Sequence, residues 1–258
     1  MEAVLDFFVA IMNWFSSVCD KFYVAFIEKD RYVNYFNGIY ITLKVSLFAV
    51  LLGIAIGVVV AVVKYSYAKK SLLVADGEEK DASYFLLKIF DKICGLYITV
   101  IRGTPVLLQM LIIYNMIFTS RDSNPVVAGA LCFGINSGAY VAEIIRAGLM
   151  SIDKGQSEAG KSLGLSSLSI MRYIILPQAI KNILPALGNE FIVLIKETSI
   201  VGYISLIDVT SAAQLIGART FDVLTPLIIA AVFYLIIVII LTFLIKKLER
   251  RLARSDRG

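Results

Sequence analysis

The chain has 258 residues, of which 59% are hydrophobic and 17% charged, with a formal net charge of +5 and no histidine. So apolar a composition excludes an ordinary soluble domain and predicts a protein that crosses the membrane several times. Three cysteines without metal-ligand spacing, together with the missing histidine, argue against a metal site. We expect no nucleic acid partner.

The first element predicted is an amphipathic helix within residues 3–27. This segment is strongly apolar, and its polar members recur on one side of a helix: Asp6, Asn13, Ser17 and Asp20. We therefore expect residues 1–35 to form an external segment that lies in the membrane interface. A sixth span is the alternative, although an aspartate at mid-bilayer costs about 3 kcal/mol.

Five membrane spans are predicted between residues 36 and 246. The first, Ile41–Val63, is long enough to cross the hydrocarbon core at about 1.5 Å per residue. Within it, Gly53 and Gly57 form a small-xxx-small pair that allows another helix to approach closely. Residues 64–92 are rich in charge, and we expect them to be solvated.

The second span, residues 93–118, is interrupted by Arg102-Gly103-Thr104-Pro105. Proline removes a backbone donor and glycine loosens the helix, so a break or bend is expected there. The third span covers residues 126–145, the fourth 179–204 and the fifth 223–245.

The distribution of basic residues predicts the orientation. Most of the 25 Lys and Arg residues lie in three segments, 64–92, 146–181 and the tail that follows the fifth span. The positive-inside rule therefore places the loop 147–178 and the tail 247–258 in the cytoplasm and the amino terminus outside.

The loop 147–178 carries a distinctive signature: Glu158-Ala159-Gly160, then Gly164, then Ile174 and Leu176-Pro177. We expect a short amphipathic helix over Gln156–Leu163, ended by Gly164 in a left-handed conformation.

The same loop also matches the phosphate-binding pattern G-x-x-x-x-G-K-S over residues 155–162. That motif requires a preceding buried strand and a nucleotide-binding domain of roughly 100 residues or more, whereas here a membrane span precedes it. We therefore do not interpret the match as a nucleotide site, and we expect no catalytic residue.

The signature loop resembles the segment by which permeases of polar amino acid ABC importers contact their ATPase. The resemblance extends, in order, over roughly residues 36–252, through R-G-T-P-V-L-L-Q at 102–109, G-A-Y-V-A-E-I-I-R at 138–146, and G-N-E-F at 188–191 with L-I-K at 194–196. Two features depart from the family: Gly160 replaces a usual alanine, at a helix cost of up to about 1 kcal/mol, and the charged loop near residues 77–81 is long.

The resemblance implies an all-α membrane permease of five transmembrane helices. It would pair with a second, identical or homologous permease, with an ABC ATPase dimer that binds the ATP, and with an extracellular substrate-binding protein. The chain would bind no cofactor itself. The residues implied to couple the permease to the ATPase are Glu158, Ala159, Gly160, Leu163 and Gly164.

Ionisable groups inside spans indicate the substrate path, because a buried charge is costly unless it is paired or hydrated. Glu143 and Glu197 are the first candidates for the substrate ammonium, and Arg102 or the amides near Thr104 for its carboxylate. Tyr234 is a candidate for the opposite wall. For Glu190 a structural ion pair is at least as plausible as a ligand contact, and Lys196 and Arg102 also have structural interpretations.

Two alternatives stay open from the residues alone. The chain could be a channel or secondary carrier that works without a partner, or a nucleotide hydrolase. The sequence does not identify which amino acid would be carried.

Overall fold

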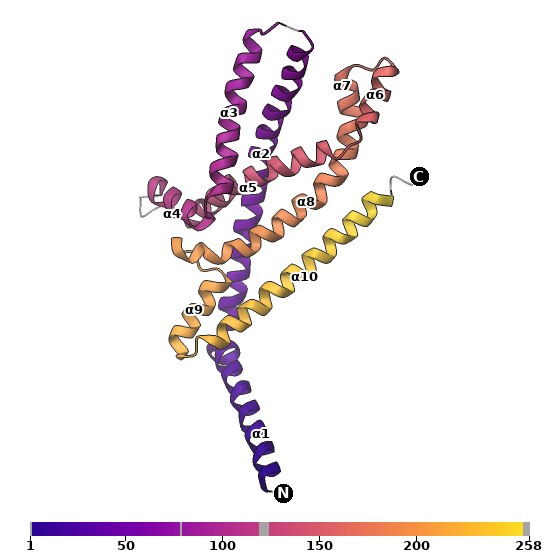
Figure 1. The fold of residues 1–258 in the computed structure, drawn as a ribbon. Helices are drawn as coiled ribbons and strands as arrows, with labels where there is room; N and C mark the ends of the chain where they lie inside the picture. The colour runs from indigo at the N-terminus through magenta and orange to yellow at the C-terminus, as the bar shows by residue number, and fades with distance from the viewer. Residues whose placement is uncertain (1, 78, 119–123, 255–258) are drawn as a thin grey trace. The chain divides into compact units, whose positions relative to one another are not determined.

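A computed structural model describes residues 2–77, 79–118 and 124–254, and every regular element in them is helical. Figure 1 shows the order of the helices along the chain. They are α1 (Glu2–Phe22), α2 (Tyr32–Ala75), α3 (Ala82–Gly103), α4 (Val106–Ile117), α5 (Pro125–Met150), α6 (Lys154–Ser162), α7 (Ser167–Ile170), α8 (Leu176–Glu197), α9 (Val209–Thr220) and α10 (Leu224–Arg254). Short π-helical segments, Tyr23–Ile27 and Met171–Ile175, and 3-10 segments, Glu28–Asp30 and Thr198–Ile204, connect some of them.

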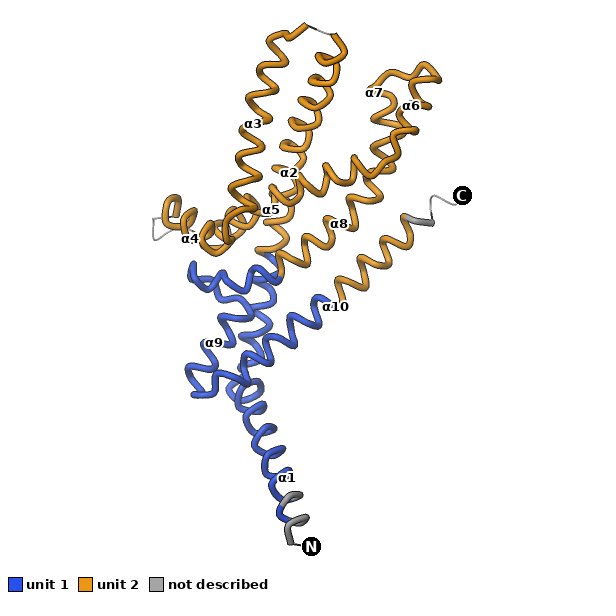
Figure 2. The backbone as a smooth tube through the Cα atoms, viewed as in Figure 1, with its two compact units in different colours: residues 1–44, 196–239 blue, residues 45–195, 240–258 orange. Residues whose placement is uncertain are grey.

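The chain divides into two compact units, which Figure 2 shows in different colours. Unit 1 comprises residues 1–44 and 196–239, and unit 2 comprises residues 45–195 and 240–258. In unit 1, a buried cluster joins α2, α9 and α10 around Tyr35, Ile216 and Ile229. The aromatic rings of Phe26, Tyr35 and Phe233 pack against one another with centroids 5.7–6.1 Å apart.

In unit 2, glycines allow α2 and α5 to pack closely. A Cβ atom on Gly53 would lie 2.9 Å from the Ser137 side chain, and one on Gly57 would lie 2.5 Å from Val141 Cγ1. From α5, Gly134 faces Leu52 in the same way. The predicted small-xxx-small pair is therefore a helix contact, with small residues on both sides of it.

Three described helices, α2, α5 and α10, are each long and apolar enough to cross a membrane. The pair α3 and α4 qualifies when counted together, with a bend of 113° between them. This confirms the predicted break in the second span. The predicted fourth span, residues 179–204, covers most of α8 and the 3-10 segment Thr198–Ile204. Helix α8 is not among the helices that qualify, so the structure does not confirm a count of five.

Helix α2 continues past the predicted end of the first span to Ala75, and Gly77 ends the turn that follows it with a left-handed φ of +106°. Asp81 caps the start of α3, because its side chain accepts a hydrogen bond from the Tyr84 amide. The charged segment 64–92 is therefore largely a helical hairpin with a short turn.

Candidate substrate cavity and coupling helix

The break between α3 and α4 follows from its local sequence. Pro105 has no backbone N–H, and it holds Thr104 in the extended conformation, with φ −126° and ψ 149°. The side chain of Gln109 closes the break, because its Nε2 donates to the carbonyl oxygen of Ile101 at 2.7 Å and to that of Thr104 at 2.9 Å. Carbonyl groups that lose their helical partners are thus satisfied within the protein.

A second amide ties this break to α5. Asn136 Nδ2 donates to Gln109 Oε1 at 2.7 Å, and Asn136 is buried. The Thr104 hydroxyl donates to the Val100 carbonyl oxygen at 2.8 Å and accepts from Gln109 Nε2 at 2.7 Å. The Arg102 end of α3 is therefore held by a network of hydrogen bonds.

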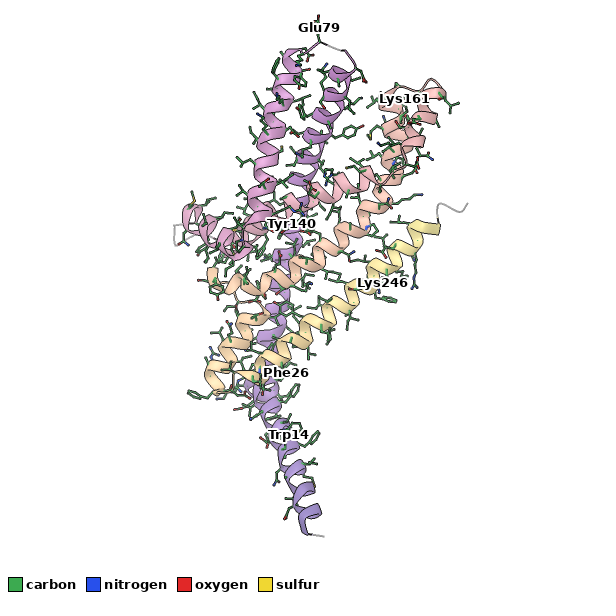
Figure 3. The ribbon with its side chains drawn as sticks, in the orientation of Figure 1. Trp14, Phe26, Glu79, Tyr140, Lys161 and Lys246 are labelled. Atoms are coloured by element: carbon green, nitrogen blue, oxygen red, sulfur yellow. The ribbon has the colours of Figure 1, made fainter. Side chains whose placement is uncertain are left out.

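A cavity of about 470 Å³ in unit 2 lies between this end of α3 and helices α5 and α8. Figure 3 labels one of its residues, Tyr140. Its polar lining residues are Arg102, Tyr140, Glu143, Arg146, Asn189 and Glu190. The lining carries both signs of charge, which suits a ligand that also carries both.

Glu143 is the centre of the charges in this cavity. One of its oxygens lies 2.7 Å from Arg146 Nη2 and 3.6 Å from Arg102 Nη1. The guanidinium of Arg102 also lies over the Tyr140 ring, 5.3 Å from its centroid. The Glu143 side chain retains 23% exposure and the two arginines 42% and 48%, so all three are accessible from the cavity.

Glu190 enters the cavity from α8. Its Oε1 accepts a hydrogen bond of 2.8 Å from the Ser137 hydroxyl on α5. The structure therefore brings together three of the predicted substrate residues, Arg102, Glu143 and Glu190, and places Thr104 in the adjoining break.

The other two predicted substrate residues, Glu197 and Tyr234, belong to unit 1 and do not line this cavity. Tyr234 donates a hydrogen bond of 2.8 Å to Asp208, a completely buried carboxylate. Asp208 also caps α9 by accepting from the amides of Thr210 and Ser211. Tyr234 thus holds the start of α9 in unit 1.

The predicted helix of the loop 147–178 is α6. Asp153 caps its start by accepting from the Gly155 amide, and Gly164 ends it with the predicted left-handed φ of +75°. Two hydrogen bonds close this end, from Gly164 N to Lys161 O at 2.9 Å and from Leu165 N to Gly160 O at 3.1 Å. This pair of bonds is a Schellman motif, which satisfies carbonyl groups at the end of α6.

Gly160 is the buried residue of α6. A Cβ atom there would lie 2.8 Å from Ile170 Cγ1 and 3.2 Å from Ile174 Cδ1. The glycine that departs from the family pattern therefore lets α6 pack closely on the segment that leads into α8. On the opposite side Glu158 is exposed, and Leu163, the residue after the helix, is 80% exposed.

The phosphate-loop match, residues 155–162, lies entirely inside α6, and the helix α5 precedes it where a nucleotide site needs a strand. Figure 3 labels Lys161 on this helix. Among the residues that the structure describes, no group of three or more Cys, Asp or Glu side chains could hold a metal ion.

Comparison with known proteins identifies the family. Residues 82–254 match the family of inner membrane components of binding-protein-dependent transport systems. The chain belongs to this family.

Named relatives of this permease are transport permeases. It is 39% identical over 221 residues to a putative glutamine transport system permease protein GlnP of Rickettsia bellii, which covers 85% of this chain and 93% of that protein. It is also 39% identical over 222 residues to the arginine transport system permease protein ArtQ of Bacillus subtilis, covering 85% and 93%.

Solved structures agree with the permease fold. A crystal structure of an amino acid ABC transporter with histidines matches with a TM-score of 0.73 and 41% identity, covering 84% of this chain and 94% of that one. An inward-facing MetNI methionine ABC transporter matches with a TM-score of 0.69, 16% identity and coverage of 88% and 99%, which shows the fold alone.

The sequence did not single out several polar residues of this permease that the structure places in the cavity or buries elsewhere. Tyr140, Arg146 and Asn189 lie inside the quoted family motifs, and their spacing from Glu143 and Glu190 was the available signal. Asp208 had a local signal too, because an aspartate directly before a helix is a preferred N-cap. Its burial was not visible from the sequence.

Proposed function

We propose that this chain is the permease subunit of an ATP-driven importer of polar amino acids. The observation that carries the proposal is the cavity in unit 2, where Arg102, Glu143 and Glu190 converge in a permease of this family. The names of its relatives, which refer to glutamine and arginine, support the substrate class.

The cavity suits the two charged groups that all amino acids share. The carboxylates of Glu143 and Glu190 would bind the ammonium group, and Arg102 would bind the carboxylate. Glu143 already pairs with Arg102 and Arg146. An incoming ammonium group would therefore compete with these two guanidinium groups for the Glu143 carboxylate.

Helix α6 would couple conformational changes of the ATPase to this cavity. We propose that α6 inserts into a cleft of a separate ABC ATPase, which binds the ATP, while a binding protein delivers the substrate and a second permease completes the path. The exposed side chains of Glu158 and Leu163 support this, because they leave a surface of this segment open to a partner. The loop 147–178 and the tail 247–258 would be cytoplasmic and the amino terminus external, in accord with the basic residues.

Glu143→Gln tests the substrate site. In proteoliposomes that contain the permease with its cognate ATPase and binding protein, we expect substrate-stimulated ATP hydrolysis and uptake to require about 10- to 100-fold more substrate, since a lost charged hydrogen bond costs about 1.5–3 kcal/mol. The matched control is Glu28→Gln, which removes a carboxylate paired with Arg31 at 3.4 Å outside the cavity. If the transport affinity of Glu143→Gln is unchanged, Glu143 does not bind the substrate.

Gly164→Val tests the coupling helix. A β-branched residue cannot adopt the left-handed conformation without strain of about 1–2 kcal/mol, so we expect weaker co-purification of the ATPase. Gly77→Val is the control, because Gly77 also has a positive φ and an open environment but lies in the α2–α3 turn. Equal loss of ATPase in both variants would contradict a specific role for α6.

Two outcomes would favour the other functions. Uptake by the chain alone, driven by an ion gradient in vesicles, would indicate a channel or secondary carrier. Nucleotide binding by the isolated chain that is lost in Lys161→Ala would indicate a nucleotide hydrolase.

A further inference from the structure

Helix α3 carries a stripe of exposed apolar side chains along its whole length. Their exposed fractions range from 47% to 66%, and their spacing places them on one face: Phe85, Ile89, Phe90, Ile93, Leu96 and Val100. No residue of α3 is buried. Because helices in proteins are stabilised mainly by packing an apolar face, this stripe requires a covering surface.

The hairpin formed by α2 and α3 has polar contacts on its inner side, where the two helices run side by side (Figure 1). The contacts across the hairpin include the ion pairs Lys64–Asp91 at 3.2 Å and Lys70–Asp81 at 3.4 Å, and the rings of Tyr67 and Tyr84 at 5.9 Å between centroids. A helical hairpin in water would show the reverse arrangement, with apolar groups inside and charges outside. The outer face of α3 is therefore suited to an apolar environment.

The continuity of the stripe indicates which environment covers it. Its membrane-span part, Ile93 to Val100, lies in the predicted second span. Apolar side chains of the same face continue to Phe85, with one exposed lysine, Lys92, among them. Because one end of this apolar stripe lies in a membrane span, we infer that the bilayer covers the rest of the stripe as well.

Lys88, one of the two lysines of α3, fits the same environment. Lys88 Nζ lies 6.0 Å from the centroid of the Tyr84 ring, one turn nearer the tip of the hairpin. The chain of Lys88 thus runs away from the membrane-span end, as snorkelling lysines do. Tyrosine and lysine next to an apolar face are typical of the membrane–water boundary.

We propose that the outer half of α3, residues 82–92, lies against the lipid bilayer at the boundary between acyl chains and headgroups. This replaces the expectation that all of residues 64–92 faces water. The proposal is independent of the transported substrate and of the ATPase. It assigns the hairpin as a membrane-surface anchor of the permease.

Tryptophan fluorescence in brominated lipid tests the proposal. The chain contains a single tryptophan, Trp14, so Trp14→Phe provides a silent background in which to introduce Phe85→Trp or Phe90→Trp. The full chain is reconstituted in phosphatidylcholine–phosphatidylglycerol vesicles with acyl chains brominated near the headgroup. Val59→Trp, at an exposed position of the first predicted span, is the lipid-facing control, and Glu79→Trp at the tip of the hairpin (Figure 3) is the water-facing control.

We expect both α3 probes to be quenched by brominated lipid within about a factor of two of the Val59→Trp probe, and to be poorly quenched by aqueous iodide. Strong iodide quenching with little lipid quenching would overturn the proposal by showing a water-facing helix. Protection from both quenchers would overturn it too, because a protein surface would then cover the stripe. Monodisperse gel filtration of each variant shows that the probes have not disrupted the fold.

Discussion

The contact between α2 and α5 makes Gly57→Ala a decisive substitution. A Cβ atom at this position would lie 2.5 Å from Val141 Cγ1 and 2.9 Å from the backbone nitrogen of Ala142. A rotamer change relieves the first clash, but the second involves the backbone of α5, so the helices must separate. Overpacking of this kind costs about 1–3 kcal/mol.

The helix propensity of alanine opposes this cost, because it exceeds that of glycine by about 1 kcal/mol. We therefore expect a net destabilisation of up to about 2 kcal/mol, which corresponds to a fall in melting temperature of up to about 8 °C for a chain of this size. Gly95→Ala is the matched control, because the nearest atom to its new Cβ would be Lys64 Nζ at 3.9 Å. In Gly95→Ala no steric clash opposes the higher helix propensity of alanine, so the melting temperature should rise.

A thiol-reactive fluorogenic dye provides the assay. Cys132 is 3% exposed in the folded protein, whereas Cys19 and Cys94 are more accessible. In a Cys19→Ser, Cys94→Ser background, the reaction of Cys132 with the dye during heating in detergent micelles therefore reports unfolding. The reasoning is refuted if Gly57→Ala melts at or above the temperature of Gly95→Ala.

The same thermal assay tests substitutions of Gln109 and Gly160, and hydrogen exchange at low pH tests the helix cap formed by Asp81. Gln109→Leu leaves the carbonyl groups of the α3–α4 break without a donor and should cost about 1–3 kcal/mol, whereas Asn115→Leu, at an exposed position one helix turn from its acceptor, should change stability by less than about 0.5 kcal/mol. Gly160→Ala should fail to stabilise the protein, despite the better helix propensity of alanine, because its Cβ would meet Ile170; a higher melting temperature would contradict this. The Tyr84 amide, followed by the Ser83 hydroxyl, holds the pKa of Asp81 below its usual value, so its cap is present above the unfolded pKa and is lost as the pH falls through the lower folded value. Hydrogen exchange at the start of α3, corrected for intrinsic rates, should therefore increase in acid in the native chain but not in Asp81→Asn, which keeps a cap that does not titrate.

Features that depend on neighbouring residues were predictable from the sequence. Pro105 acts on its own backbone and on the residue before it, so the break in the second span was visible without a structure. Gly164 in a left-handed conformation was predictable for the same reason. The close approach at Gly53 and Gly57 was also predicted, but the identity of its partner helix, α5, was not.

The end of α2 shows a limit of the same reasoning. Lys64 indicated where the apolar segment ends, and a solvated stretch was expected from there. A charge marks a change of environment, whereas a helix ends only where the backbone requires it, and here that happens near Gly77.

By itself the sequence determined that this protein is a membrane protein of helices, where its second span bends, and that a short helix with a glycine end precedes α8. These follow from composition and from local backbone chemistry. Only the tertiary structure decided that Arg102, Glu143 and Glu190 share a cavity, while Tyr234 binds Asp208 in unit 1. The physical reason is that the distance between side chains on different helices depends on how those helices pack, which charge and spacing along one chain do not specify.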